Sequence, residues 1–412
     1  MVVTVKERSG YPSIMVKNKH DISGYDLANY QRDIYDGNLL YESFLKMKRG
    51  RTWKPQVQRF EMTYLLGLGK IQKELKNKTY QMNNTTNFVI SERGKTRLIT
   101  GECVSDRIVG HALCDEIINP SIKKYLIYDN GASQKGKGVS FTRKRLEKHL
   151  ISYYRNNGCS NEGYILLIDF SKYYDNIRHD ILKEMFFDIV RDEHARDIIS
   201  KTLKRAEIDI SFTEDDLSES IFDSLWYYNN IPKSMRNGTR FLKKHLDIGT
   251  QVSQSAGVLY RSKLDNYIKI VRGIKYYAAH VDDSYIIHSD KVFLKKFYLD
   301  ISNKCDEYGI HINKKKTSIY KLSDGFRFLQ IRYRLTDTGK IVKKINPKNV
   351  TRFRRKIKKL AHILSENEFD NLFKSWIGSN AKYMSKQQRK NMYKLYYDLK
   401  NQFYKINGVY VS

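Results

Sequence analysis

A seven-residue run, Tyr164 to Phe170 (YILLIDF), constrains the fold of this chain more than any other segment. Its continuous apolar character is typical of a buried strand. Near its end the run has an acidic residue, Asp169, and a helical pattern follows from His179 to Val190. The sequence therefore predicts a sheet in which one buried strand ends at a carboxylate.

A second acidic position lies in the segment from Gly273 to His288 (GIKYYAAHVDDSYIIH), which has the pattern of a β-hairpin with Asp282 and Asp283 at its turn. Phosphoryl transfer assisted by two metal ions needs them about 3.5–4 Å apart, and hard carboxylates hold Mg²⁺ well. One strand-end carboxylate and two at a hairpin tip suit that chemistry. A lone Asp pair is weak evidence, because turns attract Asp, and spacing alone does not bring Asp169 and Asp282 together.

The remaining segments alternate between helical and extended patterns. Apolar residues recur at helical spacing within residues 25–80, 106–118, 252–271 and 293–308. Extended patterns occur from Asn87 to Thr100, around a turn at Glu92 to Lys95, and again from Phe326 to Tyr333. A charged, loop-like region is expected from Arg205 to Asp247.

The charge of the chain points to a polyanionic partner. Lys and Arg number 75 against 45 Asp and Glu, a formal net charge of +30, and each phosphate that they neutralise releases counterions. A simple basic binding protein would have the same surplus. From Ile341 to Ser412 the chain holds 17 Lys or Arg and 4 Asp or Glu, a local charge of +13. This block has the pattern of helices with basic faces, such as Arg352 to Ile363, and favours a nucleic-acid contact.

The four cysteines lie far apart without CxxC spacing, so neither a zinc site nor a disulfide framework is expected. Met1 to Gly10 has no apolar core of a signal peptide, and no stretch approaches 18 apolar residues. We therefore expect a cytoplasmic protein that does not enter a membrane.

Six segments match, in order along residues 87 to 335, the motifs of one enzyme family. They are Arg93 to Arg97 with Asp106-Arg107, Asp169 to Ile177 (DFSKYYDNI), Ile248 to Gln254 (IGTQVSQ), His280 to Asp283 (HVDD), Gly309 to Thr317 (GIHINKKKT) and Phe328 to Gln330 (FLQ). In these residues the chain resembles bacterial and phage reverse transcriptases, whose palm is like that of group II intron enzymes. One departure is His280, which stands where the family has tyrosine. A histidine beside two metal-bound carboxylates can be held protonated, and the motif assigns this one no role.

The resemblance implies an α/β (α+β) right-hand polymerase with an antiparallel palm sheet backed by helices. Fingers are expected from residues 1–103, with a return at 178–245. The palm would comprise residues 104–177 and 246–335, and a basic helical thumb residues 336–412.

The resemblance also implies catalytic roles for particular residues. Asp169, Asp282 and Asp283 would bind two Mg²⁺ ions, for which Mn²⁺ substitutes, together with the backbone carbonyl of Phe170. Lys316 would approach the leaving pyrophosphate, and Lys314 and Lys315 beside it compete for this assignment. These residues would make the chain an RNA-directed DNA polymerase, a nucleotidyltransferase.

Further residues are expected to bind nucleotide and primer. Lys95 and Arg97 would grip the triphosphate, because stabilising the developing phosphate charge is the main catalytic effect available. Tyr174 would be the steric gate against a ribose 2′-hydroxyl. The nucleotide pocket would include Ile248, Gly249 and Gln254, and the primer grip Phe328, Leu329 and Gln330.

The expected partners are template RNA in the form of a structured non-coding RNA, nascent DNA and dNTPs, with an accessory protein or self-assembly in addition. The motif from Ile248 to Gln254 ends in glutamine. In this it resembles the enzymes of diversity-generating retroelements, and similar variants occur among phage-defence enzymes. Two biological roles therefore stay open. Two alternatives of a different kind are a non-catalytic RNA-binding scaffold on a polymerase fold, and a polymerase that makes RNA or a template-independent product.

Overall fold

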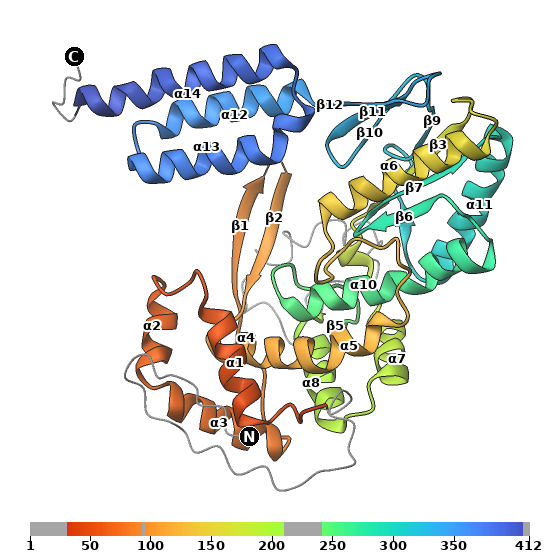
Figure 1. The fold of residues 1–412 in the computed structure, drawn as a ribbon. Coiled ribbons are helices and arrows are strands. Elements are labelled where there is room, and N and C mark those ends of the chain that lie inside the picture. Colours follow the sequence, from red (N-terminus) through yellow and green to blue (C-terminus); the bar gives the residue numbers. More distant parts are fainter. Residues whose placement is uncertain (1–30, 93–94, 210–240, 407–412) are drawn as a thin grey trace, which may run out of the picture.

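The computed structural model describes residues 31–92, 95–209 and 241–406. It consists of N-terminal helices with a long β-hairpin, a central sheet with helices on both faces, and a C-terminal bundle of helices (Figure 1). This mixture confirms the expected α/β class. Residues 1–30 and 210–240, which belong to the expected fingers, lie outside the described residues.

The central sheet is antiparallel and is built around strand β3 (Tyr164–Ser171). On one side β3 pairs with β7 (Asp283–His288), which in turn pairs with β6 (Tyr277–His280). On the other side β3 pairs with β8 (His311–Ile312) and β9 (Ser318–Lys321). The predicted strand, the predicted hairpin and the antiparallel palm sheet are thereby confirmed.

Both faces of β3 are buried, which explains its continuous apolar sequence. Leu166 and Ile168 belong to a core shared with α10 (Gln251–Asn266) and α11 (Lys291–Glu307). Ile165 points to the opposite face, where it joins a second core formed by α6 (Val139–Asn156) and the C-terminal elements. Successive side chains of the strand thus enter two different cores.

The N-terminal elements confirm the predicted helices and hairpin. The hairpin strands β1 (Thr86–Glu92) and β2 (Lys95–Gly101) extend from the N-terminal helices in the direction of the C-terminal helices (Figure 1). The surrounding elements are α1 (Gly37–Lys48), α2 (Pro55–Met62), α3 (Tyr64–Lys76), α4 (Val104–Ala112) with a π-helical continuation (Leu113–Ile118), α5 (Asn119–Lys123), α7 (His179–Ile189) and α8 (Glu193–Arg205). Short strands β4 (Ile208–Asp209) and β5 (Phe241–Leu242) pair with each other.

In the C-terminal part the predicted extended structure is confirmed, although as a hairpin, whereas a helix at the start of the basic block is not. The segment from Phe326 to Tyr333 is two antiparallel strands, β10 (Phe326–Phe328) and β11 (Ile331–Leu335), because the chain reverses at Leu329 and Gln330. The basic block does not begin with a helix, since β12 (Ile341–Ile345) pairs with β11.

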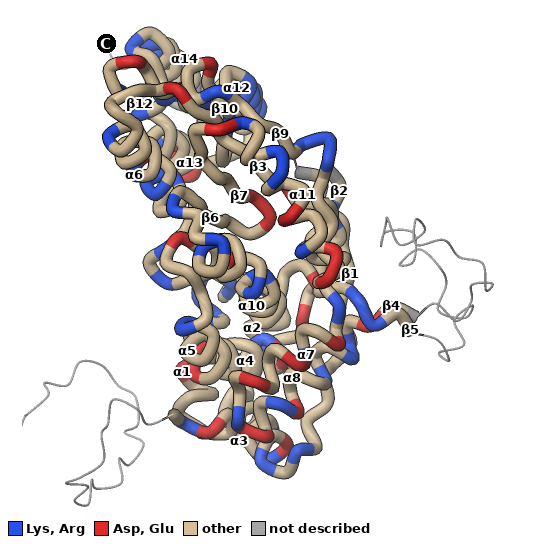
Figure 2. Tube along the Cα trace, turned by 90° about the vertical axis from the view of Figure 1, so that its right-hand side faces the viewer, with Lys and Arg blue, Asp and Glu red and all other residues tan. Residues whose placement is uncertain are grey.

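Helices α12 (Pro347–Leu360), α13 (Glu366–Asn380) and α14 (Lys386–Ile406) follow and form the C-terminal bundle. Asn346 caps the N-terminus of α12, because its side chain accepts a hydrogen bond from the Lys348 amide at 3.1 Å. Seven of its 14 residues are Lys or Arg, and they give this end of the molecule its basic character (Figure 2). Within the described ranges, we find no helix whose length and apolar character would let it cross a membrane.

Candidate active site

The register of the central sheet brings the three predicted carboxylates to one place. Asp169 on β3 is the direct cross-strand partner of Asp283 on β7. Because His280 pairs with Asp283, the β6–β7 turn consists of Val281 and Asp282. Asp282 therefore lies at the hairpin tip beside the Asp169–Asp283 pair.

The turn that carries Asp282 is strained. Val281 has φ = 54°, a left-handed conformation that a β-branched residue rarely adopts and that costs about 1–3 kcal/mol. Its carbonyl accepts a hydrogen bond from Nη1 of Arg261, a side chain of α10 that is 1% exposed. A hydrogen bond from a charged donor contributes about 1.5–3 kcal/mol, enough to offset the strain.

The electrostatics of the carboxylates suit a bound cation. Burial, followed by the charges of Asp282 and Asp169, raises the pKa of Asp283 to about 7. Carboxylate oxygens are hard ligands of the kind that Mg²⁺ prefers, so the donor set and its mutual repulsion fit a divalent ion. Within residues 31–92, 95–209 and 241–406, no three His, Cys, Asp or Glu side chains already converge as a ligand cluster. One oxygen of Asp169 is bound by a lysine instead.

That lysine is Lys316. The contact with Asp169 distinguishes it from Lys314 and Lys315, which competed for the same assignment. Its Nζ lies 2.7 Å from Asp169 Oδ2. The segment is also fixed through its backbone, since the Asn313 amide donates to the Asp169 carbonyl at 2.8 Å. The geometry therefore places the predicted Lys316 ammonium within the group of carboxylates.

Tyr174 lies between helix α10 and the hairpin tip. A Cβ on Gly257 of α10 would come within 3.1 Å of the Tyr174 hydroxyl, so the ring lies against the helix at a position without a side chain. Burial, followed by the charge of Asp282, raises the pKa of Tyr174 to about 12. Gln254 is exposed and lies one turn before Gly257, on the same face of the helix.

Ile248 and Gly249 lie against the base of the β1–β2 hairpin. The Ile248 carbonyl accepts a hydrogen bond from the Thr100 amide at 2.9 Å. Gly249 has φ = 124°, and a Cβ there would come within 2.9 Å of the Thr100 carbonyl oxygen. Ile248 and Gly249 are thus joined to β2, the strand that carries Arg97. The Arg97 side chain is exposed, and the Lys95 side chain lies outside the described part.

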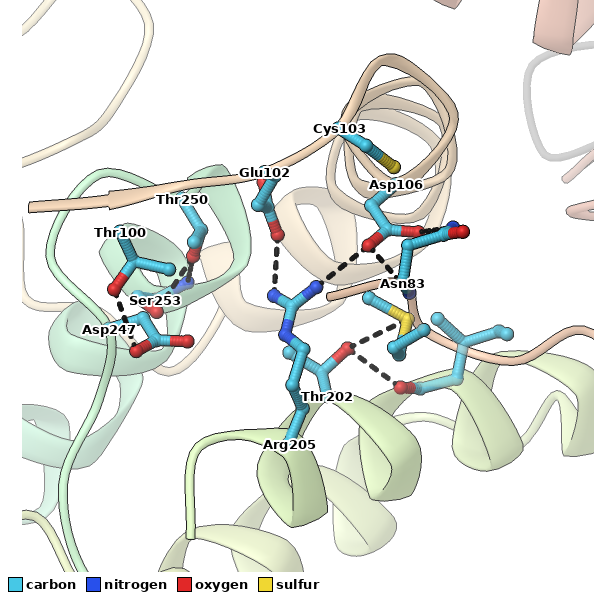
Figure 3. Close-up of polar contacts among 12 residues, drawn as sticks. Asn83, Thr100, Glu102, Cys103, Asp106, Thr202, Arg205, Asp247, Thr250 and Ser253 are labelled. Atoms are coloured by element: carbon cyan, nitrogen blue, oxygen red, sulfur yellow. Dashed lines mark hydrogen bonds and ion pairs between the residues drawn. The ribbon is translucent and has the colours of Figure 1, made fainter. Parts of the chain in front are cut away.

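A buried ion-pair network lies at the base of the same hairpin, next to the C-terminal end of β2 (Figure 3). Arg205 of α8 donates to Glu102 at 2.6 Å and to Asp106 at 3.0 Å. Nearby, the Thr100 hydroxyl donates to Asp247 at 2.9 Å, just before the Ile248 segment. Burial, which outweighs the attraction to Arg205, raises the pKa of Glu102.

The expected primer-grip residues lie at the β10–β11 turn. Leu329 (φ = 43°) and Gln330 (φ = 72°) are both left-handed. Arg143 of α6 donates to the Leu329 carbonyl at 2.5 Å and 3.2 Å. Phe328 packs edge-on against Tyr285 of β7 with ring centroids 5.1 Å apart, which connects the turn to the strand that begins at Asp283.

The surroundings of His280 favour its neutral form over the protonated one. Burial lowers the pKa of His280, and this effect exceeds the opposing attraction of Asp282. Its Nδ1 lies 3.2 Å from the hydroxyl of Thr142 on α6. A neutral imidazole that packs under the hairpin follows from this burial.

Sequence reasoning missed a buried polar group beside the carboxylates. Arg261, Asp265 and Tyr277 are each at most 1% exposed and hydrogen bond with one another. The available signal was the pair Arg261 and Asp265, four residues apart in an otherwise apolar helical pattern.

Comparison with known proteins adds the following. A family model described as "Reverse transcriptase (RNA-dependent DNA polymerase)" matches residues 90–333, which is more than half of the chain. No curated protein matches.

Solved structures with similarity include three telomerases. They are telomerase from Candida albicans in complex with a TWJ fragment of telomeric RNA (13% identity, 85% of this chain and 65% of that chain, TM-score 0.42), apo telomerase from Candida tropicalis truncated from its C-terminal domain (15%, 64% and 55%, 0.42) and apo telomerase from Candida tropicalis (14%, 82% and 66%, 0.46). This chain therefore spans between 55% and 66% of the length of these telomerase chains.

Proposed function

Because the chain belongs to the reverse transcriptase family, we propose that it is an RNA-directed DNA polymerase that copies a dedicated RNA template into DNA. The observation that carries this proposal is the cross-strand pairing of Asp169 with Asp283, with Asp282 at the adjoining turn. All three carboxylates lie inside the matched residues 90–333.

In this proposal Asp169, Asp282, Asp283 and the carbonyl of Phe170 hold two Mg²⁺ ions, or Mn²⁺ ions in their place. When bound, such ions polarise the phosphate and stabilise the attacking and leaving oxygens. Lys316, already within the group, is suited to neutralise the leaving pyrophosphate.

The remaining side chains orient the substrates. Lys95 and Arg97 on β2 contact the triphosphate, while Ile248, Gly249 and Gln254 line the nucleotide pocket. Tyr174 excludes a ribose 2′-hydroxyl, a role supported by its place between α10 and Asp282. The turn of Phe328, Leu329 and Gln330 holds the primer end.

We also assign the three lobes by this proposal. Residues 1–103 and 178–245 form the fingers, residues 104–177 and 246–335 the palm, and residues 336–412 the thumb. The seven Lys and Arg of α12 support contact between the thumb and the template–primer backbone.

The decisive test is incorporation of dNTPs on an RNA template with a DNA primer, with and without Mg²⁺. We expect metal-dependent extension by the wild type and its loss in Asp282→Ala and Asp283→Ala. Asp306→Asn, which alters an exposed carboxylate of α11, is the matched control and should extend normally. If function survives loss of the two aspartates, the protein is a non-catalytic scaffold and the proposal is wrong.

We further propose that the enzyme serves either a diversity-generating retroelement or an anti-phage defence system. The sequence from Ile248 to Gln254 supports this setting. Sequencing the nucleic acid that co-purifies with the protein separates the two roles. Complementary DNA of a template repeat is expected for the first, and complementary DNA of a structured non-coding RNA for the second.

A further inference from the structure

One buried side chain, Arg261, contacts both segments that carry the carboxylates. Its Nη1 donates to the carbonyl of Val281, the residue before Asp282. Its guanidinium carbon also lies 4.8 Å from the ring centroid of Phe170, the residue after Asp169. A single planar group on α10 thus spans the gap between the end of β3 and the tip of the β6–β7 hairpin.

The guanidinium is itself fixed in place. Its Nε donates to Asp265 Oδ1 at 2.9 Å, and its Nη2 donates to the Tyr277 hydroxyl at 3.2 Å. Tyr277 donates in turn to Asp265 at 2.5 Å, and Asn130 donates to the other Asp265 oxygen at 2.9 Å. Burial alone would lower the pKa of Arg261, but Tyr277 and Asp265 raise it, so the charge is retained.

The contact with Val281 acts on a residue that needs support. In a two-residue hairpin turn, a positive φ at the first central position is usually supplied by Gly or Asn. Here the residue with the positive φ, 54°, is a valine, Val281. If Val281 returned to an extended conformation, the peptide planes on both sides of Val281 would rotate, and the Asp282 carboxylate would leave its place beside the Asp169–Asp283 pair.

We propose that Arg261 is a positioning residue, which holds the Val281 turn and the Phe170 ring so that Asp282 stays beside the cross-strand pair of Asp169 and Asp283 for the binding of divalent ions. This inference deepens the proposed function and rests on it. Arg261 reaches the chemistry through Val281 and Phe170, so it is expected to touch neither substrate nor metal.

Arg261 could act by fixing the geometry of the turn or only through its positive charge, and the two explanations predict opposite changes in metal affinity when the side chain is removed. Arg261 attracts Asp283, and a positive charge near the ligands repels a metal ion. If charge were its whole effect, Arg261→Met would bind a divalent ion more tightly than the wild type. If Arg261 sets the geometry, the same variant binds the ion more weakly, because loss of a group that orients ligands typically costs about 10–100-fold in metal affinity or activity.

The experiment measures Mn²⁺ binding to the full chain without nucleic acid, by calorimetry and by the electron paramagnetic resonance signal of Mn²⁺. Asp283→Asn identifies the signal that belongs to the carboxylates. For Arg261→Met we expect about 10–100-fold weaker Mn²⁺ binding and a similar loss in the rate of dNTP incorporation. The KM for dNTP should change by about twofold or less, because the pocket residues stay in place.

Arg196→Met is the matched control for folding. Arg196 donates to the backbone carbonyls of Val190 at 2.7 Å and Phe187 at 2.6 Å and lies over the Phe187 ring, the same kinds of contact in a helical region apart from the carboxylates. It should leave Mn²⁺ binding unchanged. Arg261→Lys, which keeps the charge but cannot make all the contacts at once, covers the case in which Arg261→Met does not fold and should show an intermediate loss.

A second comparison places the effect at the turn. Glycine adopts a positive φ without strain, so the loss caused by Arg261→Met should be several-fold smaller when measured in a Val281→Gly background. An equal loss in both backgrounds overturns the proposal, as does unchanged or tighter Mn²⁺ binding by Arg261→Met, or an equal loss in Arg196→Met. If the wild type binds Mn²⁺ through Asp283 and Arg261→Met weakens it, but no dNTP is incorporated, the proposed function fails while this inference stands.

Discussion

Replacing Arg205 with methionine should loosen the base of the β1–β2 hairpin, and the loss should grow with pH. The side chains of Arg205, Glu102 and Asp106 are 12%, 6% and 0% exposed, so their ion pairs are poorly screened. Removing one partner from a buried pair typically costs about 3–5 kcal/mol. Asp106 keeps hydrogen bonds from Tyr80 at 2.7 Å and from Asn83 at 2.8 Å and 3.0 Å. We therefore expect the lower value, about 3 kcal/mol, with most of it falling on Glu102.

The pH dependence follows from the direction of the pKa shift of Glu102. Burial raises this pKa in the folded protein, and loss of Arg205 removes an effect that lowers it. The folded variant therefore favours the protonated form of Glu102. Below the ordinary glutamate pKa the destabilisation from ionised Glu102 is absent, and it develops as pH rises through the raised value. The cost should therefore be smaller at pH 5 than at pH 8, where it should reach about 3 kcal/mol.

Amide hydrogen exchange of peptides from α4 and α8 measures this local stability. Comparing Arg205→Met with the wild type at the same pH removes the intrinsic pH dependence of exchange. At pH 8 a loss of 3 kcal/mol corresponds to exchange about 150-fold faster. In a Glu102→Gln background the difference between pH 5 and pH 8 should disappear. A loss that is equal at both pH values, or larger at pH 5, would refute the assignment of the cost to Glu102.

Three further predictions concern nucleotide and template. Tyr174→Ala should lower the preference for dNTP over rNTP by roughly tenfold or more, measured as the ratio of kcat/KM values, and an unchanged ratio would contradict the steric-gate role. Gly249→Ala should destabilise the protein by about 1–3 kcal/mol in urea unfolding and raise the KM for dNTP, whereas Gly69→Ala, in open space on α3, should stabilise it by about 0.5–1 kcal/mol. Replacing Arg352 and Lys356 with glutamine should reduce the slope of log K for template–primer binding against log salt by about two.

The last prediction has a control on the same helix. Arg354 and Lys358 are also exposed and have the same i, i+4 spacing, but they lie on another side of α12. Arg352 and Lys356 line a cleft with Gln330 of the β10–β11 turn, which the other pair does not. Replacing Arg354 and Lys358 should therefore change the slope less, and equal slopes would mean that binding does not depend on which face is basic.

Much of the central sheet could be predicted because local pattern and tertiary environment agree there. The run Tyr164 to Phe170 is apolar because both faces of β3 are covered, and the β6–β7 hairpin has a clear pair of β-rich flanks. That Asp169 would meet Asp283 could not be read from spacing, since register between distant strands depends on the cores on each side. The ordered family motifs supplied what periodicity could not.

The features that the sequence pattern did not indicate have local causes. At Leu329 and Gln330 the chain reverses through two left-handed residues that are neither Gly nor Asn, so the usual turn signal is missing. A hydrogen bond from Arg143, distant in sequence, supports that turn instead. Burial of His280 under α6 likewise depends on tertiary packing, which decides its protonation against the nearby charge of Asp282.

The order of strands around β3 has a consequence for how the protein is made. Every strand that pairs with β3 comes later in the chain, namely β7, β8 and β9. During synthesis on the ribosome, β3 with Asp169 is made first. It has no strand to pair with until β7 is made, and its last partner, β9, is complete only at Lys321. A nascent chain that ends before β8 lacks one flank of the sheet, and one that ends before β7 lacks the strand that sets Asp283 opposite Asp169.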